Sequence, residues 1–167
     1  YFSLNKLLSN TSFKLTTEQL KSIKEILNDL NSSNRMMRLL HGDVGTGKTI
    51  VAILTALYIA KSNYQIAIMV PSELLAKQHF FSINKITKEL SIETELLTSN
   101  VKDKKLVLDK IKLGTAKIVI GTQALIQKQV VFKCLSYVII DEQHRFGVEQ
   151  RLKIREKGKN VDMLLMS

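Results

Sequence analysis

A glycine-rich segment followed by a lysine and a hydroxyl residue is the part of the chain best suited to chemistry. It fits the pattern G-x-x-x-x-G-K-[ST] at every fixed position, through Gly42, Asp43, Val44, Gly45, Thr46, Gly47, Lys48 and Thr49. The glycines let the backbone turn around a phosphate chain, and a following helix presents its positive end to the same anion. In such a loop Lys48 reaches the β- and γ-phosphates and the Thr49 hydroxyl is a ligand of Mg²⁺. The pattern predicts a nucleotide–magnesium site.

Two adjacent carboxylates, Asp141 and Glu142, follow the apolar stretch at residues 137–140. Phosphoryl transfer needs one carboxylate in the shell of Mg²⁺ and another group to orient the attacking water. Neighbouring residues of a strand point to opposite sides, so an adjacent pair can serve both targets. We expect Asp141 to hold Mg²⁺ and Glu142 to act as the general base. Without the loop, the pair would be equally typical of a solvated strand end that caps a turn.

Apolar runs and turn residues predict the elements that position these groups. We expect helices over residues 16–30, 48–61, 71–89 and 102–113, and strands before the loop and over residues 65–70, 92–97, 117–120, 137–140 and 162–166. This alternation is typical of an α/β fold in three layers, a doubly wound parallel sheet with helices on both faces. Ligands of such sheets bind beyond the carboxyl ends of the strands, and the informative polar residues follow those ends.

Composition adds weaker limits. The 167 residues are enough for one ordinary domain, and no apolar run is long enough to cross a membrane, so we expect no membrane partner. The single Cys134 fits a reducing cytoplasm. The formal charge is +10, and residues 101–167 carry 14 basic and 7 acidic side chains. Such an excess favours a polyanionic partner, although a lysine-rich solvated surface explains it equally well.

The string DEQH at residues 141–144 resembles the DExH box of superfamily 2 helicases. The longer string DEQHRFGVEQR, at residues 141–151, resembles the bacterial RecG-type branch-migration helicases. Further strings are similar to the same family, namely RLLHGDVGTGKT (38–49), AIMVPSELLAKQ (67–78), GTQALIQ (121–127) and FKLTTEQ (13–19). The related coupling-factor and primosomal restart helicases share a DEEH-like box, so Gln143 favours the RecG type. The resemblance covers residues 13–167 and implies a RecA-like P-loop NTPase lobe.

The resemblance implies roles for residues outside the two chemical motifs. Gln19 would read the adenine edge, which makes the nucleotide ATP. One DNA contact would be the loop and helix start at Pro71, Ser72 and Glu73, and a second contact to the same strand would be Gly121 and Thr122. Backbone N–H groups and small hydroxyls suit a motor that grips phosphates without reading bases.

The resemblance also implies partners and a domain organisation. Residues 16–167 would form the first RecA-like lobe, truncated at its C-terminal end, and residues 1–15 a lead-in from a preceding domain. Gln143 and His144 would couple the ATP site to the DNA side or to a second lobe. The implied partners are branched or forked DNA, a second RecA-like lobe with an arginine finger, and a wedge domain of the same parent chain, in a bacterial cytoplasm at the nucleoid. An arginine finger contributes about 10³–10⁵ in rate, so we expect the chain alone to bind nucleotide with little turnover and no unwinding.

Three other functions stay open on the sequence. The chain could belong to another double-stranded DNA translocase, such as the transcription-repair coupling factor type. A P-loop kinase or transport ATPase would carry a lid or a family signature after the loop, and the sequence shows neither. A basic nucleic-acid-binding module without turnover would use the charge and leave Lys48 without a role.

Overall fold

Strands and helices alternate along the chain, as the sequence predicts. The computed structural model describes Ser9, residues 14–42 and residues 47–167. In chain order the elements are α2 (Thr17–Leu30), β1 (Met37–Leu40), α3 (Lys48–Lys61), β2 (Gln65–Met69), α4 (Glu73–Glu89), β3 (Thr94–Leu97), α5 (Lys104–Leu113), β4 (Ile118–Gly121), η1 (Gln123–Ile126), β5 (Leu135–Ile140), η2 (Gln143–Arg145), α6 (Val148–Arg155) and β6 (Asp162–Met166), where η marks a short 3-10 helix.

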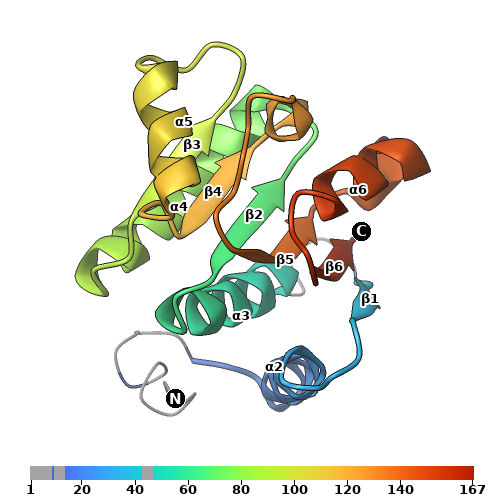
Figure 1. The fold of residues 1–167 in the computed structure, drawn as a ribbon. Helices are drawn as coiled ribbons and strands as arrows, with labels where there is room; N and C mark the ends of the chain where they lie inside the picture. The colour runs from blue at the N-terminus through green and yellow to red at the C-terminus, as the bar shows by residue number, and fades with distance from the viewer. Residues whose placement is uncertain (1–8, 10–13, 43–46) are drawn as a thin grey trace.

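The strands form one parallel sheet in the order β1-β6-β5-β2-β4-β3 (Figure 1). Strands β2 and β4 are buried along their whole length, while β1 at one edge alternates between exposed and half-buried residues. Nearly continuous apolar strands such as 65–70 are what a sheet covered on both faces requires. The prediction of a doubly wound parallel sheet is therefore confirmed.

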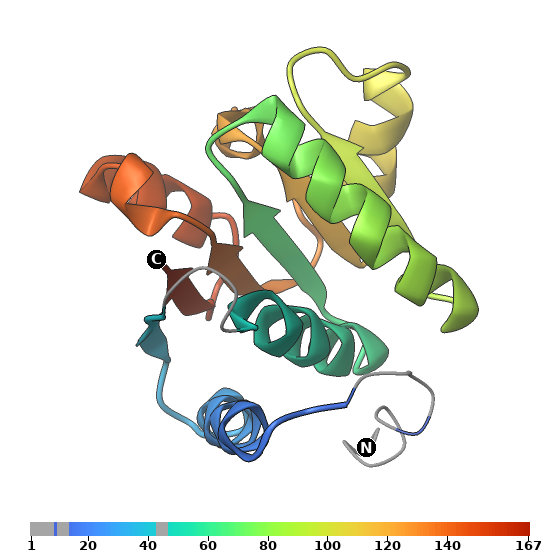
Figure 2. The ribbon, with the colours of Figure 1, turned by 180° about the vertical axis from the view of Figure 1, so that it is seen from behind.

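Helices cover both faces of this sheet (Figures 1 and 2). On one face α2, α3 and α4 pack over inward side chains such as Ile68, Ile120 and Ile139. On the other face α5, η1 and α6 pack over the alternate residues of the same strands, such as Val119 and Val138. Helix α3 is buried from residue 51 to residue 60 because α2 covers the side that faces away from the sheet.

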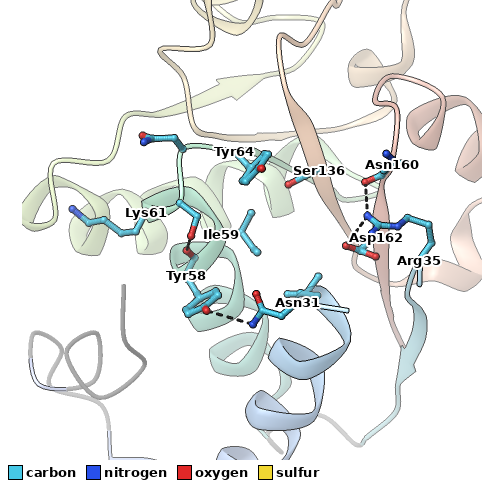
Figure 3. A pocket seen from close by; sticks show the side chains of 12 residues that line it. Asn31, Arg35, Tyr58, Ile59, Lys61, Tyr64, Ser136, Asn160 and Asp162 are labelled. Carbon is cyan, nitrogen blue, oxygen red and sulfur yellow. Dashed lines mark hydrogen bonds and ion pairs between the residues drawn. The ribbon is translucent and has the colours of Figure 1, made fainter. Parts of the chain in front are cut away.

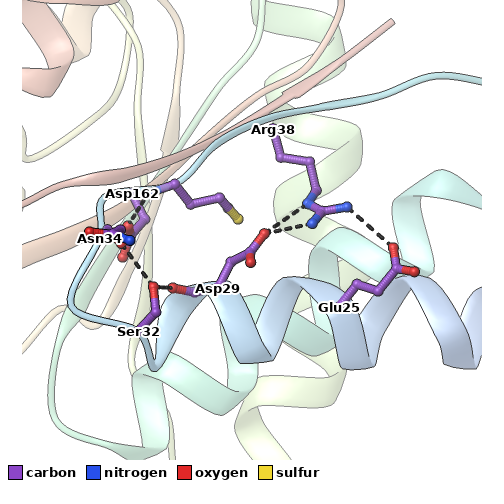
Figure 4. A network of polar contacts seen from close by, with 7 residues as sticks. Glu25, Asp29, Ser32, Asn34, Arg38 and Asp162 are labelled. Carbon is purple, nitrogen blue, oxygen red and sulfur yellow. Dashed lines mark hydrogen bonds and ion pairs between the residues drawn. The ribbon is translucent and has the colours of Figure 1, made fainter.

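Helix α2 is fixed at its start and along its side. Thr16 and Gln19 form a reciprocal capping box, in which each side chain accepts the other's backbone N–H. Arg38 of β1 then reaches across to α2 and pairs with Asp29 at 2.6 Å and Glu25 at 3.3 Å (Figure 4). These contacts hold α2 beside the strand that leads into the glycine-rich loop.

The structure adds detail that the sequence patterns do not contain. Helix α4 begins at Glu73 rather than residue 71, since Ser72 is its N-cap and accepts the N–H of Leu75 at 3.2 Å. Strand β5 begins two residues earlier than expected, and α6 follows the acidic pair where no helix was predicted. Within the described ranges, none of the helices combines the length and the apolar character needed to cross a membrane.

Candidate active site

The strand ends on the carboxyl side of the sheet, called the carboxyl edge below, gather the predicted site residues. Gly42 follows β1, and Gly47 caps α3 in the left-handed region at φ +79°. Lys48 opens the helix, and its Nζ donates to the carbonyl oxygen of Gly42 at 2.7 Å and to that of Ser167 after β6. Lys48 therefore joins the segment that follows β1 to the segment that follows β6. The predicted loop residues Asp43, Val44, Gly45 and Thr46 lie outside the described residues.

Gln19 is brought to the loop from α2. A Cβ placed on Gly47 would collide with the amide nitrogen of Gln19, so the two residues lie against each other, and the φ of +79° favours glycine at position 47. The Oε1 atom of Gln19 accepts the N–H of Thr16 at 2.9 Å, which fixes the orientation of its amide. An amide held in this way beside the phosphate-binding loop can present its free N–H to a ligand.

Asp141 lies at the end of β5, beside β2. Its backbone N–H donates to the carbonyl oxygen of Met69 at 3.0 Å. Its Oδ1 accepts the N–H of Glu142 at 2.9 Å, and its Oδ2 lies 3.1 Å from Nε2 of His79. Burial raises the pKa of Asp141, but the bond and charge of His79, the Glu142 N–H and the charge of Lys48 together hold this pKa below its usual range. The carboxylate is thus ionised and near the lysine, as a magnesium ligand must be.

Glu142 has an unusual backbone for a residue with a long side chain. Its φ is +49°, in the left-handed region that costs an L-residue about 1–2 kcal/mol. Strain of this kind persists where surrounding structure imposes it, often at functional sites. Here the turn between β5 and η2 imposes it, and the turn directs the chain away from the sheet directly after the two carboxylates.

A second group of loops meets at the ends of β2, β3 and β4. Glu73, at the start of α4, accepts bonds from Thr98 Oγ1 at 3.0 Å and Asn100 Nδ2 at 3.2 Å. These two bonds lower the pKa of Glu73, and the bond from Asn100 has the larger effect. Gly121 packs so closely on β3 that an added Cβ would lie 2.2 Å from the carbonyl oxygen of Leu97. The predicted DNA contacts at Pro71, Ser72, Glu73, Gly121 and Thr122 are therefore neighbours, with Thr122 capping η1.

The predicted coupling residues lie in η2. Gln143 accepts a bond from Nη1 of Arg151 at 2.5 Å, so the first turns of α6 hold it in place. His144 is exposed, while Phe146 behind it is buried. This arrangement gives η2 a fixed base and two accessible side chains, His144 and Arg145, which is what a contact to another lobe or to DNA requires.

Several residues of this edge were missed by sequence reasoning. His79, Thr98 and Asn100 each touch a predicted site residue through a side chain from another element. For His79 one signal was present: it lies seven residues after the N-cap Ser72, which places both on one face of α4. The other contacts join segments whose proximity no local pattern reveals.

A cavity lies elsewhere, at the amino ends of the strands (Figure 3). It has a volume of about 710 Å³ and lies between the end of α2, the end of α3 and the start of β6. Its polar groups pair with one another: Arg35 with Asn160 and Asp162, and Asn31 with Tyr58. The predicted phosphate-binding residue Lys48 and the ionised carboxylate of Asp141 lie instead at the carboxyl edge.

A parallel sheet whose carboxyl edge combines a phosphate-binding loop with an Asp-Glu pair defines a RecA-like nucleotide-binding lobe. Residues 16–167 match the DEAD/DEAH box helicase family. The chain is 49% identical to the ATP-dependent DNA helicase RecG of Borreliella burgdorferi, over 98% of this chain and 24% of that protein. It is 51% identical to the RecG of Aquifex aeolicus, over 95% of this chain and 20% of the relative. The chain belongs to the DEAD/DEAH box helicase family and, within it, to the RecG type.

Solved structures agree with this assignment. A structure of RecG bound to a three-way DNA junction superimposes with a TM-score of 0.85 at 41% identity, covering 98% of this chain and 22% of that one. The DUF1998 helicase MrfA shares the fold at a TM-score of 0.73 and 20% identity. The resemblance drawn from the sequence is thus confirmed, and the chain spans about a quarter of the length of the curated relatives it matches.

Proposed function

We propose that this chain is the ATP-binding motor lobe of a DNA helicase that couples ATP hydrolysis to the remodelling of branched DNA. The observation that carries the proposal is the carboxyl edge itself. It places Lys48 near the ionised Asp141, and at the ends of the next two strands, β2 and β4, it carries the loops with the predicted DNA contacts. Its RecG relatives are ATP-dependent DNA helicases by name, and one solved RecG is bound to a DNA junction.

The nucleotide side has a residue for each task. Lys48 neutralises the β- and γ-phosphates, and the first turn of α3 directs its N–H groups at them. Gln19, fixed against Gly47, presents its amide to the adenine edge, which selects ATP. Glu142 accepts the proton of the attacking water as general base. We assign the loop residues Asp43, Val44, Gly45 and Thr46 to the phosphates as well.

The residues present fit a magnesium ion. Its ligands would be the Thr49 hydroxyl and the Asp141 carboxylate, whose lowered pKa keeps it charged. The part of the chain that the structure describes has no cluster of three or more His, Cys, Asp or Glu that could hold a metal. Mg²⁺ typically retains waters and binds through one or two protein oxygens plus phosphates. When bound, Mg²⁺ would neutralise the charge that develops on the phosphate oxygens.

The DNA side would grip a strand by its backbone. Ser72 at the start of α4 and Thr122 at the start of η1 supply hydroxyls beside helix N-termini, and Gly121 lets the backbone come close. Glu73 accepts hydrogen bonds from Thr98 and Asn100, and these bonds hold the start of α4 beside the segment that follows β3. The +10 charge favours a polyanion. Gln143 and the exposed His144 would pass the state of the nucleotide to the DNA or to a second RecA-like lobe.

The remaining assignments follow the family. Residues 16–167 would be the lobe itself and residues 1–15 a lead-in from a preceding domain. The second lobe and a wedge domain would belong to the same parent chain, which would act in the bacterial cytoplasm at the nucleoid. Because an arginine finger comes from the second lobe, the chain alone would bind nucleotide and turn over little ATP.

The test is DNA-stimulated ATP hydrolysis by the full-length parent protein carrying Lys48→Ala. We expect a loss of at least about 10²-fold, as for other removed charge-stabilising groups at active sites. Lys88→Ala, an exposed lysine at the far end of α4, is the matched control and should retain the wild-type rate. A Lys48→Ala protein that hydrolyses ATP normally would refute the proposal. DNA binding by a parent protein without any ATP hydrolysis would favour a binding module.

A further inference from the structure

His79 connects helix α4 to the carboxylate assigned to magnesium. Its Nε2 lies 3.1 Å from Oδ2 of Asp141, and the two side chains are only 15% and 19% exposed. An ionised carboxylate can only accept hydrogen bonds, so Nε2 of His79 must carry the proton. The contact joins residues that are 62 positions apart and two different layers of the fold.

This bond completes the fixation of the Asp141 carboxylate. Oδ1 accepts the Glu142 N–H at 2.9 Å, and Oδ2 receives His79. A carboxylate has about four lone-pair positions, so each oxygen retains one for a ligand while two donors hold its plane. With only the Glu142 bond, the carboxylate could rotate about χ2 and Oδ2 would lose its fixed direction. Partners of this kind orient metal ligands and tune their affinity.

Helix α4 is itself held at the end that starts the predicted DNA contact. Ser72 caps it, and Glu73 in its first turn is bonded to Thr98 and Asn100. His79 lies seven residues further, about 10 Å along the helix axis. A displacement of the helix start is therefore carried along a stiff element to the carboxylate.

We propose that His79 is a positioning residue that orients Asp141 for magnesium and ties it to the helix that begins at the DNA-binding surface. This inference depends on the proposed function, in which Asp141 holds the ion. It adds a residue outside the phosphate-binding loop and the acidic box, and it gives the imidazole a defined task at Nε2.

The experiment compares three variants in the full-length parent protein. H79L removes the donor, H79N keeps a donor that falls short of Oδ2, and H79Q keeps one of similar reach. The readouts are the Mg²⁺ concentration that half-saturates DNA-stimulated ATP hydrolysis, and the affinity for a fluorescent ATP analogue measured in Mg²⁺ and in EDTA. Gln78→Leu, at an exposed neighbour on α4, controls for a polar-to-apolar change.

We expect H79L and H79N to need about 10-fold more Mg²⁺, the lower end of the range for lost partners of metal ligands. H79Q should stay within about 3-fold of the wild type, and analogue affinity in EDTA should be unchanged in all variants. If H79L does not fold, the pair H79Q and H79N carries the test. Wild-type Mg²⁺ dependence in H79N, or an equal loss in H79Q, would overturn the positioning role.

The two proposals fail in different ways. A parent protein whose ATP hydrolysis does not require Lys48 contradicts the motor function, whatever His79 does. Normal Lys48-dependent hydrolysis with unaltered Mg²⁺ dependence in H79L and H79N contradicts only the role of His79. The EDTA measurement separates both from a general loss of nucleotide binding.

Discussion

Replacing Gly121 by alanine should show how closely two of the site loops are packed. Gly121 ends β4 and is paired with Leu97 at the end of β3. An added Cβ would lie 2.2 Å from the Leu97 carbonyl oxygen and 3.0 Å from Cγ of Leu125. The leucine side chain can rotate away, but the carbonyl belongs to a buried strand. The methyl group therefore forces the backbone of β3 or β4 to move.

The size of the effect follows from this distance. Real Cβ atoms almost never come closer than 3.0 Å to another heavy atom, so the strands must separate by about 0.8 Å. Overpacking of a closely packed interior costs about 1–3 kcal/mol, and the lower chain entropy of alanine returns up to about 1 kcal/mol. We expect the free energy of unfolding to fall by about 2 kcal/mol, which lowers Tm by about 4–8 °C.

Urea unfolding followed by circular dichroism measures this difference. Gly147→Ala is the matched control, because a Cβ at that position meets no atom within 4 Å and its φ of −77° suits any residue. Its free energy of unfolding should stay within about 0.5 kcal/mol of the wild type, since the N-cap preference and the entropy gain oppose each other. A Gly121→Ala protein as stable as this control would refute the close approach of β3 and β4.

Two further predictions concern the acidic groups. Glu142→Asn should raise Tm by about 2 °C, because asparagine tolerates a φ of +49° better than glutamate, while ATP hydrolysis by the parent protein is lost. A lower Tm would contradict the assigned backbone strain. Burial raises the pKa of Asp162, although the Met36 N–H and the charge of Arg35 act in the opposite direction. The contribution of Asp162 to the free energy of unfolding is therefore complete at pH values below its pKa in the unfolded chain, and it is lost as the pH rises through its pKa in the folded protein. Asp162→Asn should therefore gain stability relative to the wild type as pH increases across that window, which urea titrations at several pH values would measure. A difference that does not change with pH would contradict the raised pKa.

Most elements could be predicted because their signals are local. The strand at residues 65–70 is apolar at every position after Gln65, and α2 has a capping box and a buried stripe at Ile23, Ile26 and Leu27. Helix α6 escaped prediction because Val148 and Leu152 are exposed and only Ile154 is buried, so it has no apolar stripe. Its capping through Gln150 is local, but weak as a signal in isolation.

The site also has features that are local in the sequence and features that depend on the tertiary fold. The loop and the acidic pair are contiguous in sequence, so their chemistry could be inferred from residue types and spacing. The contacts of Asp141 with His79 and of Glu73 with Thr98 depend on which strands are neighbours. The order β5-β2-β4 follows from packing over the whole sheet, and no pattern within one element encodes it.

In the proposed motor, the strand order also sets the distance between the nucleotide site and the DNA site. Asp141 follows β5 and Gly121 ends β4, with only β2 between them. Neighbouring strands lie about 4.8 Å apart, which sets the two sites about 10 Å from each other. Since β2 and β4 are wholly buried and protein interiors compress little, we expect this spacing to stay nearly constant during a cycle of the proposed motor. In the proposed motor, movement during a cycle would then come from rotation of whole lobes, while the two sites on this lobe keep their spacing.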